Sequence, residues 1–282
     1  MTQSQAELLE RVASIAPGTW AQIGAVAIVS TLALLPVAWL GVKRLVPARN
    51  IVFARWGFSH VALSILLFLI VTFAATLVLT PGQSLAGDLL LSVTAFGAVA
   101  AAIAAWAVRL DPDGVRVLGL RLQGAPRAIL AGLLAYVVAL PGIAGVMPLW
   151  TWILGVCGHV AAPQEVAARF AALAPDERAL PMFLGIAVQP LLEEVVFRSF
   201  LQPLLVQNFR EVAGVALTSV CFAALHGVDA LLPIFALSCL LGAVMLRTQS
   251  LLAVWLLHAL NNGIMFAILI ARPELVGGGG GS

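Results

Sequence analysis

Two adjacent glutamates lie in the middle of an apolar run, and an arginine follows four residues after the second of them. The run reads LLEEVVFR over residues 191–198, inside a stretch long enough to cross a bilayer. Charged side chains at membrane depth cost about 2.5–3.5 kcal/mol each even on the lower scales, so they mark functional sites or paired networks. Glu193, Glu194 and Arg198 are therefore the first candidates for chemistry in this chain.

The spacing of these three charges predicts different roles for them. Residues i and i+4 share one face of a helix, so Glu194 and Arg198 can form a supporting ion pair. Glu193 is turned about 100° around the same helix, and the spacing predicts no partner for it. An unpaired carboxyl group in a low-dielectric site suits general acid–base catalysis.

Two histidines in later apolar segments complete a set that could hydrolyse a bond. His226 shares a helical face with Phe222, and His258 shares one with Asn262. A carboxylate and an imidazole can activate a water molecule, and amide and imidazole N–H groups can stabilise an oxyanion. We therefore expect hydrolysis inside a membrane, with three segments meeting around one polar cavity.

The same side chains leave a metal mechanism open. Glu193, His226 and His258 form a plausible zinc set with one free position. The chain has no His-Glu-x2-His element, which would have favoured zinc. We expect no obligatory cofactor and keep zinc as an alternative.

The composition places these residues in a membrane protein. Of 282 residues, 62% are hydrophobic and 10% are charged, whereas soluble domains carry about 25% charged residues. The mean hydropathy is +1.06. The net charge of +2 gives no support for nucleic-acid binding, and three cysteines without paired spacing predict no disulfide framework.

Eight apolar segments can be drawn, and each must be helical because a backbone in hydrocarbon has to satisfy its own hydrogen bonds. They cover residues 20–42, 57–80, 87–108, 127–149, 180–206, 212–229, 231–247 and 251–271. We therefore predict an all-α polytopic membrane bundle of about eight transmembrane helices. It forms one domain over residues 20–276, with a catalytic core over about 180–271. An amphipathic segment over 1–19 precedes it, and 277–282 resemble a flexible linker.

Basic residues predict the orientation and the membrane. Ten of them lie at one set of segment ends and four at the other. This asymmetry places the basic loops in the cytoplasm and both termini outside. Arginine outnumbers lysine fourteen to one, which hints at a GC-rich bacterial genome. We therefore expect the inner membrane of a bacterium.

Three elements on three apolar segments carry a resemblance to a known family. They read EEVVFR at residues 193–198, FAALH at 222–226 and HALNN at 258–262, in this order. In these elements the chain resembles the CPBP family of intramembrane proteases. This family is also called the Abi or CAAX-protease family, and it includes the Ras-converting CAAX endopeptidases. The resemblance covers about residues 180–266.

The resemblance implies a role for each matched residue. Glu193 corresponds to the glutamate that activates water, and His226 corresponds to its partner at that water. His258 and Asn262 correspond to the pair that stabilises the oxyanion of the tetrahedral intermediate. The other two charges of the 193–198 element correspond to a supporting ion pair.

Two functions remain open at this point. The first is an intramembrane endopeptidase that cuts a peptide or a membrane-associated protein while in contact with lipid. The alternative is a non-enzymatic membrane protein, either a proton-coupled transporter or an immunity-type binding protein, whose buried charges form a structural network. The sequence predicts neither the substrate nor the oligomeric state.

Overall fold

The protein is helical throughout the part that the structure describes. The computed structural model describes residues 16–46, 54–162 and 164–273, and no strand occurs within these ranges. The predicted all-α class is therefore confirmed. The predicted amphipathic segment over 1–19 falls mostly outside the described residues, and the predicted linker over 277–282 falls wholly outside them.

Within the described residues, seven helical runs are long and apolar enough to cross a membrane, which indicates an integral membrane protein. They are α2 (Pro17–Leu45), α3 (Phe58–Thr76), α4 (Leu85–Leu110), α5 (Ala125–Val156), the run Pro175–Phe209, the run Val228–Thr248 and α12 (Leu251–Ala271). The fifth run comprises η2 (Pro175–Glu177), α7 (Ala179–Phe183), η3 (Leu184–Val188), α8 (Gln189–Glu194), η4 (Val195–Leu201) and α9 (Gln202–Phe209). The sixth comprises η5 (Val228–Ala230) and α11 (Leu231–Thr248). Between the runs lie η1 (Gly114–Leu118), α6 (Glu165–Ala171) and α10 (Glu211–Ala224).

The prediction of eight spanning helices is wrong by one. The predicted segment over 212–229 is α10, which has only 14 residues. At 1.5 Å per residue it is about 21 Å long, and the hydrocarbon core is about 30 Å thick. The helix ends early because Gly227 takes a φ of +79° and turns the chain into η5. His226 therefore lies at a helix end, next to a turn.

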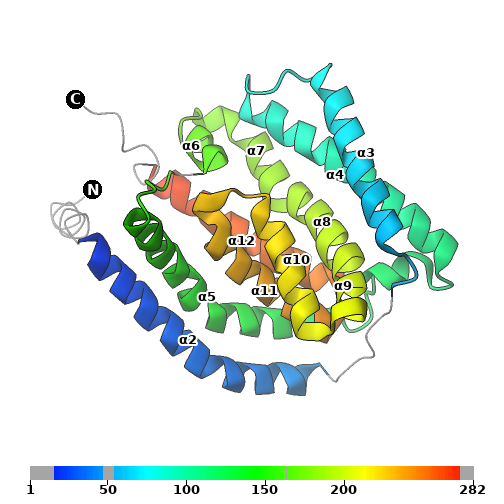
Figure 1. Cartoon of the computed structure of the whole chain (residues 1–282), viewed down its shortest axis with the longest axis horizontal. Helices are drawn as coiled ribbons and strands as arrows, with labels where there is room; N and C mark the ends of the chain where they lie inside the picture. The colour runs from blue at the N-terminus through cyan, green and yellow to red at the C-terminus, as the bar shows by residue number, and fades with distance from the viewer. Residues whose placement is uncertain (1–15, 47–53, 163, 274–282) are drawn as a thin grey trace.

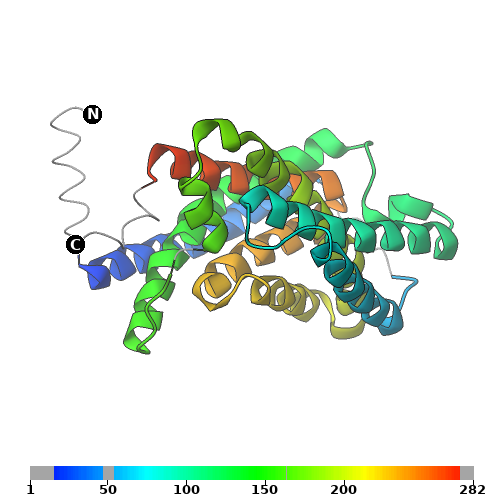
Figure 2. The ribbon, with the colours of Figure 1, turned by 90° about the horizontal axis from the view of Figure 1, so that it is seen from above.

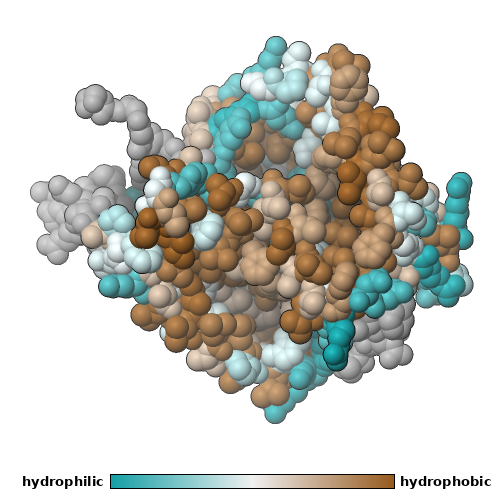
Figure 3. Space-filling view, in the orientation of Figure 1, coloured by the Kyte–Doolittle hydropathy of each residue, from teal (hydrophilic) through white to brown (hydrophobic). Residues whose placement is uncertain are grey.

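The helices form three groups in space. Figure 1 shows α2 and α5 side by side at one edge of the molecule, and α3 and α4 paired at the opposite edge. Between them lie α8, α10, α11 and α12, and Figure 2 gives the perpendicular view of the same bundle. The outward faces of α2 and α3 carry exposed apolar side chains such as Val29 and Phe73. Figure 3 shows that apolar residues dominate the visible surface, as hydrocarbon requires of a spanning bundle.

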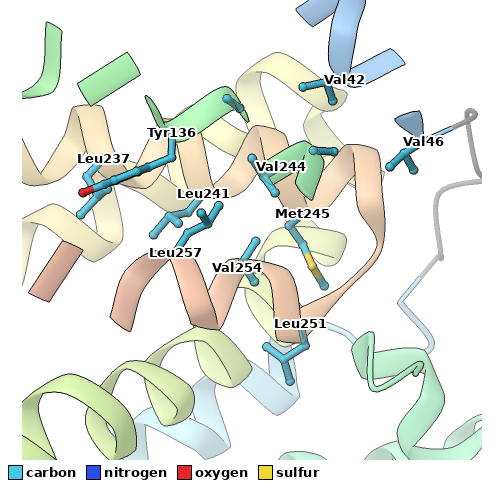
Figure 4. Packing of buried hydrophobic residues seen from close by; sticks show 12 residues of the cluster. Val42, Val46, Tyr136, Leu237, Leu241, Val244, Met245, Leu251, Val254 and Leu257 are labelled. Atoms are coloured by element: carbon cyan, nitrogen blue, oxygen red, sulfur yellow. The ribbon is translucent and has the colours of Figure 1, made fainter. Parts of the chain in front are cut away.

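The main core lies where α5, α11 and α12 meet. Leu241 and Val244 of α11 pack with Leu257 of α12, and all three are almost fully buried. Tyr136 of α5 belongs to the same cluster. Figure 4 shows these side chains turned toward one another from their three helices. This packing fixes α12 in the centre of the bundle and so determines where its polar face points.

Close contact between α2 and α5 depends on glycine. A Cβ atom added at Gly145 of α5 would lie 2.6 Å from the backbone oxygen of Gly24 of α2. Two helix backbones approach this closely only where small residues face each other, a common arrangement between membrane helices. Gly155, on the same helix, has no atom within 4 Å of the corresponding position.

We expect Gly145→Ala to lower the free energy of unfolding by about 1–3 kcal/mol, because the added methyl group meets backbone that cannot yield cheaply. The matched control is Gly155→Ala, which adds the same methyl group to open space on the same helix. That control should be neutral or slightly stabilising, since alanine favours helix over glycine. Thermal unfolding in detergent measures both variants, and equal midpoints would contradict the expected close contact.

Candidate active site

The helix that carries the two glutamates is irregular on both sides of them. α8 is preceded by the π-helical segment η3 and followed by the π-helical segment η4. Pro190 lies in the first turn of α8 and lacks the N–H that a regular helix would use to bond four residues back. Short π-helical segments occur frequently at functional sites, because the altered turn redirects side chains and frees carbonyl groups.

Two carbonyl groups of η3 bind side chains of α12. The indole N–H of Trp255 donates to the Ala187 oxygen at 2.8 Å, and Nδ2 of Asn262 donates to the Gly185 oxygen at 2.9 Å. The two donors are two turns apart on one face of α12, with His258 between them on that face. These bonds hold His258 against the helix that carries the glutamates.

A fully buried ion pair lies at the end of α8. Oε2 of Glu194 and Nε of Arg198 are 3.3 Å apart, and neither side chain is exposed. The guanidinium also donates through Nη2 to the hydroxyl of Ser238 on α11 at 3.0 Å, and it lies 5.0 Å from the ring centroid of Phe222 on α10. Buried charges need this compensation, since their desolvation is costly.

His258 lies between the two glutamates. Its Nδ1 is 2.8 Å from Oε1 of Glu194, and its Nε2 is 3.8 Å from Oε2 of Glu193. An ionised carboxylate only accepts, so Nδ1 carries a proton toward Glu194. Nε2 is then the atom whose protonation can change, and it faces Glu193.

Glu193 is the more open of the two acids, with 12% of its side chain exposed. Its Oε1 accepts a hydrogen bond from Nε2 of Gln189 at 2.8 Å. The sequence predicted no partner for this carboxylate, although Gln189 precedes it by four residues, a spacing that could have revealed the contact.

His226 is joined to this cluster only through an aromatic ring. Its Nδ1 donates to the Phe222 carbonyl at 2.9 Å. The ring of Phe222 lies 4.8 Å from the His226 ring and 5.8 Å from the His258 ring. Among the described residues no hydrogen bond or ion pair links His226 to Glu193. Its Nε2 remains available to a substrate or a water molecule.

The turn that follows His226 is tied to the C-terminal end of α5 and to the residues just after it. Trp150 donates through its indole N–H to the Val228 oxygen at 2.8 Å. Nε2 of His159 lies 2.6 Å from Oδ1 of Asp229. The position of His226 therefore depends on α5 as well as on its own helix.

A family comparison agrees with this grouping of residues. Residues 175–264 match the family model described as "Type II CAAX prenyl endopeptidase Rce1-like". Residues 175–264 form an Rce1-like domain. It occupies about a third of the chain and contains α8, α10 and α11 together with most of α12. No curated protein and no solved structure matches the chain.

The Rce1-like domain contains every side chain predicted for the site. Some of these side chains contact one another in the structure, and others bind elsewhere. The two glutamates, Arg198 and His258 contact one another directly. Asn262 binds the backbone of η3, and its neighbour Asn261 instead accepts a hydrogen bond from Tyr136 of α5 at 3.2 Å. Ser238 was missed by sequence reasoning, because a single serine in an apolar segment gives no signal of its partner.

The zinc alternative requires Glu193, His226 and His258 to converge. Within the described ranges no three His, Cys, Asp or Glu side chains form a group that could hold a metal ion. These residues therefore do not fit a zinc site in the present arrangement. Metal dependence stays a prediction that a chelator can test.

We expect Arg198→Met to lower the free energy of unfolding by about 3–5 kcal/mol, because it leaves the buried Glu194 carboxylate without its main counter-charge. The double variant Glu194→Gln with Arg198→Met should recover most of that loss. Denaturant unfolding in detergent measures all variants.

The matched control is the exposed pair Glu165–Arg169, which has the same i,i+4 spacing and the same 3.3 Å separation. The side chain of Glu165 is 82% exposed, so Glu165→Gln should change the unfolding free energy by less than about 1 kcal/mol. If Arg198→Met were as stable as Glu165→Gln, burial would not determine how much an ion pair contributes to the free energy of unfolding.

Proposed function

We propose that this protein is an intramembrane endopeptidase that hydrolyses a peptide bond of a membrane-associated protein or peptide. The contact of Glu193 with His258 beside a buried ion pair carries the proposal. The matched family, which consists of CAAX prenyl endopeptidases, supports it. The arginine-rich composition favours the inner membrane of a bacterium as its location.

The proposed reaction begins with a water molecule beside the Glu193 carboxylate. Glu193 takes a proton from the water while the water oxygen forms a bond to the scissile carbonyl carbon. The carbonyl π electrons move onto its oxygen, which becomes an oxyanion. When the tetrahedral intermediate collapses, the carbon–nitrogen bond breaks and Glu193 returns the proton to the departing amine.

Donors around the site are arranged to stabilise the oxyanion. Asn262 uses one amide N–H for the Gly185 oxygen and keeps a second N–H for another acceptor. When protonated, His258 donates through Nε2, and Glu194 holds the ring in place from the other side. In this proposal His226 contributes its Nε2 to the attacking water, a role that rests on the family resemblance.

Oxygen Oε2 of Glu193 is the better proton acceptor of that carboxylate in this scheme. Oε2 faces His258 and accepts no hydrogen bond in the described structure, whereas Oε1 already accepts one from Gln189. A base must have a free lone pair directed at the proton it takes. The proposed step uses protein groups and water alone.

We expect Glu193→Gln to lower the cleavage rate of a quenched membrane-associated peptide by about 10²–10⁴-fold, because the amide cannot accept the water proton. The thermal unfolding midpoint should stay close to that of the wild type. Exposed Glu211, replaced by Gln, is the matched control and should cleave at the normal rate. Wild-type cleavage by Glu193→Gln would refute the proposal, and proton flux in liposomes without proteolysis would favour a transporter.

We also expect 1,10-phenanthroline and EDTA to leave the cleavage rate unchanged, because the proposed water is activated by a carboxylate. The assay uses the purified full chain before and after chelator treatment, with metal content measured on the same samples. Loss of cleavage that added zinc restores would establish the metal alternative.

A further inference from the structure

We infer that Gln189 is a positioning residue for Glu193 and that it selects which carboxylate oxygen takes the proton. This inference rests on the proposed function and adds a residue to it. Gln189 lies in the first turn of α8, at the junction with η3, and Glu193 lies one turn later. Nε2 of Gln189 donates to Oε1 of Glu193 at 2.8 Å.

The two oxygens of Glu193 therefore have different surroundings. Oε1 is held by an amide N–H on its own helix, while Oε2 is 3.8 Å from Nε2 of His258 on α12. A charge-assisted hydrogen bond restricts rotation of the carboxylate about its last torsion angle. With Oε1 fixed in this way, Oε2 remains directed toward His258 and toward the proposed water.

The hydrogen bond of Gln189 lies within its own helix. Within the part of the chain that the structure describes, its side chain hydrogen-bonds a residue four positions later on the same helix, so the bond joins no two helices. Its Oε1 is buried without a hydrogen-bond partner, which is unfavourable for a polar atom. An apolar side chain of the same length would fill this space without that penalty, so the contact with Glu193 is what the amide provides.

Gln202 offers a matched comparison within the same helical run. It is a buried glutamine, whereas Gln189 is partly buried, and the Oε1 of Gln202 likewise lacks a hydrogen-bond partner. Its Nε2 donates to the Gly242 oxygen at 3.0 Å, which ties α9 to α11. The hydrogen bond of Gln202 therefore joins two helices, whereas the hydrogen bond of Gln189 holds a carboxylate on its own helix.

The test replaces each glutamine by methionine, which has nearly the same shape but cannot donate. We expect Gln189→Met to lower kcat about 10-fold, as loss of a hydrogen bond to a charged group predicts. KM and the unfolding midpoint should remain unchanged. Gln202→Met should lower the unfolding midpoint and leave kcat unchanged. Gln189→Glu keeps the shape but replaces the donor by a second acid, so its kcat should fall at least as far.

The inference is overturned if Gln189→Met has wild-type kcat, or if its kcat falls only together with its unfolding midpoint. Glu193→Gln is measured alongside to separate two kinds of failure. If Glu193→Gln abolishes cleavage while Gln189→Met is normal, only the role of Gln189 is wrong. If Glu193→Gln cleaves normally, the proposed function itself is wrong.

Discussion

The buried charge of Arg198 is the constraint on which the rest of the domain depends. A guanidinium removed from solvent needs partners that compensate for its lost hydration. Its own helical run and the helices α10 and α11 supply them. Glu194 provides the counter-charge, Ser238 on α11 accepts a hydrogen bond from the guanidinium, and the ring of Phe222 on α10 faces the guanidinium. α12 joins through His258, which binds the same Glu194. Removing the counter-charge leaves a desolvated charge inside the bundle, so this network couples the packing of the four elements.

The π-helical segments η3 and η4 allow one continuous helical run to bind several neighbouring elements. Carbonyl groups of the first segment bind the side chains of Trp255 and Asn262, which fixes α12 on the side of the glutamates. In the second segment the Phe200 carbonyl accepts the indole N–H of Trp56, and Ser199 donates to the Leu118 oxygen of η1. The helix that carries the acids is thus held at both ends by contacts that a regular α-helix would not offer.

Adjacent glutamates end up with different roles because a helix turns about 100° between them. Glu194 faces the interior and is held by the Arg198 guanidinium on one side and by Nδ1 of His258 on the other, so it is fixed as a counter-ion. Glu193 faces the less enclosed side and keeps one oxygen outside any hydrogen bond. A single pair of identical side chains therefore provides both a rigid support for His258 and a carboxylate that can exchange a proton.

The sequence alone determined the helical class, the limits of most spanning helices and the pairing of Glu194 with Arg198. All of these follow from hydrophobic length and from helical period, which are local properties. The tertiary structure decided the rest. It ended α10 at Ala224, three residues before a glycine with positive φ, so the described residues contain seven long apolar helices instead of eight. It placed His258 between both acids and gave Glu193 a glutamine partner. The position of His258 depends on how α12 packs against π-helical turns, and no pattern within a single segment contains that information. The glutamine contact lies within one helix, and its i,i+4 spacing was already present in the sequence.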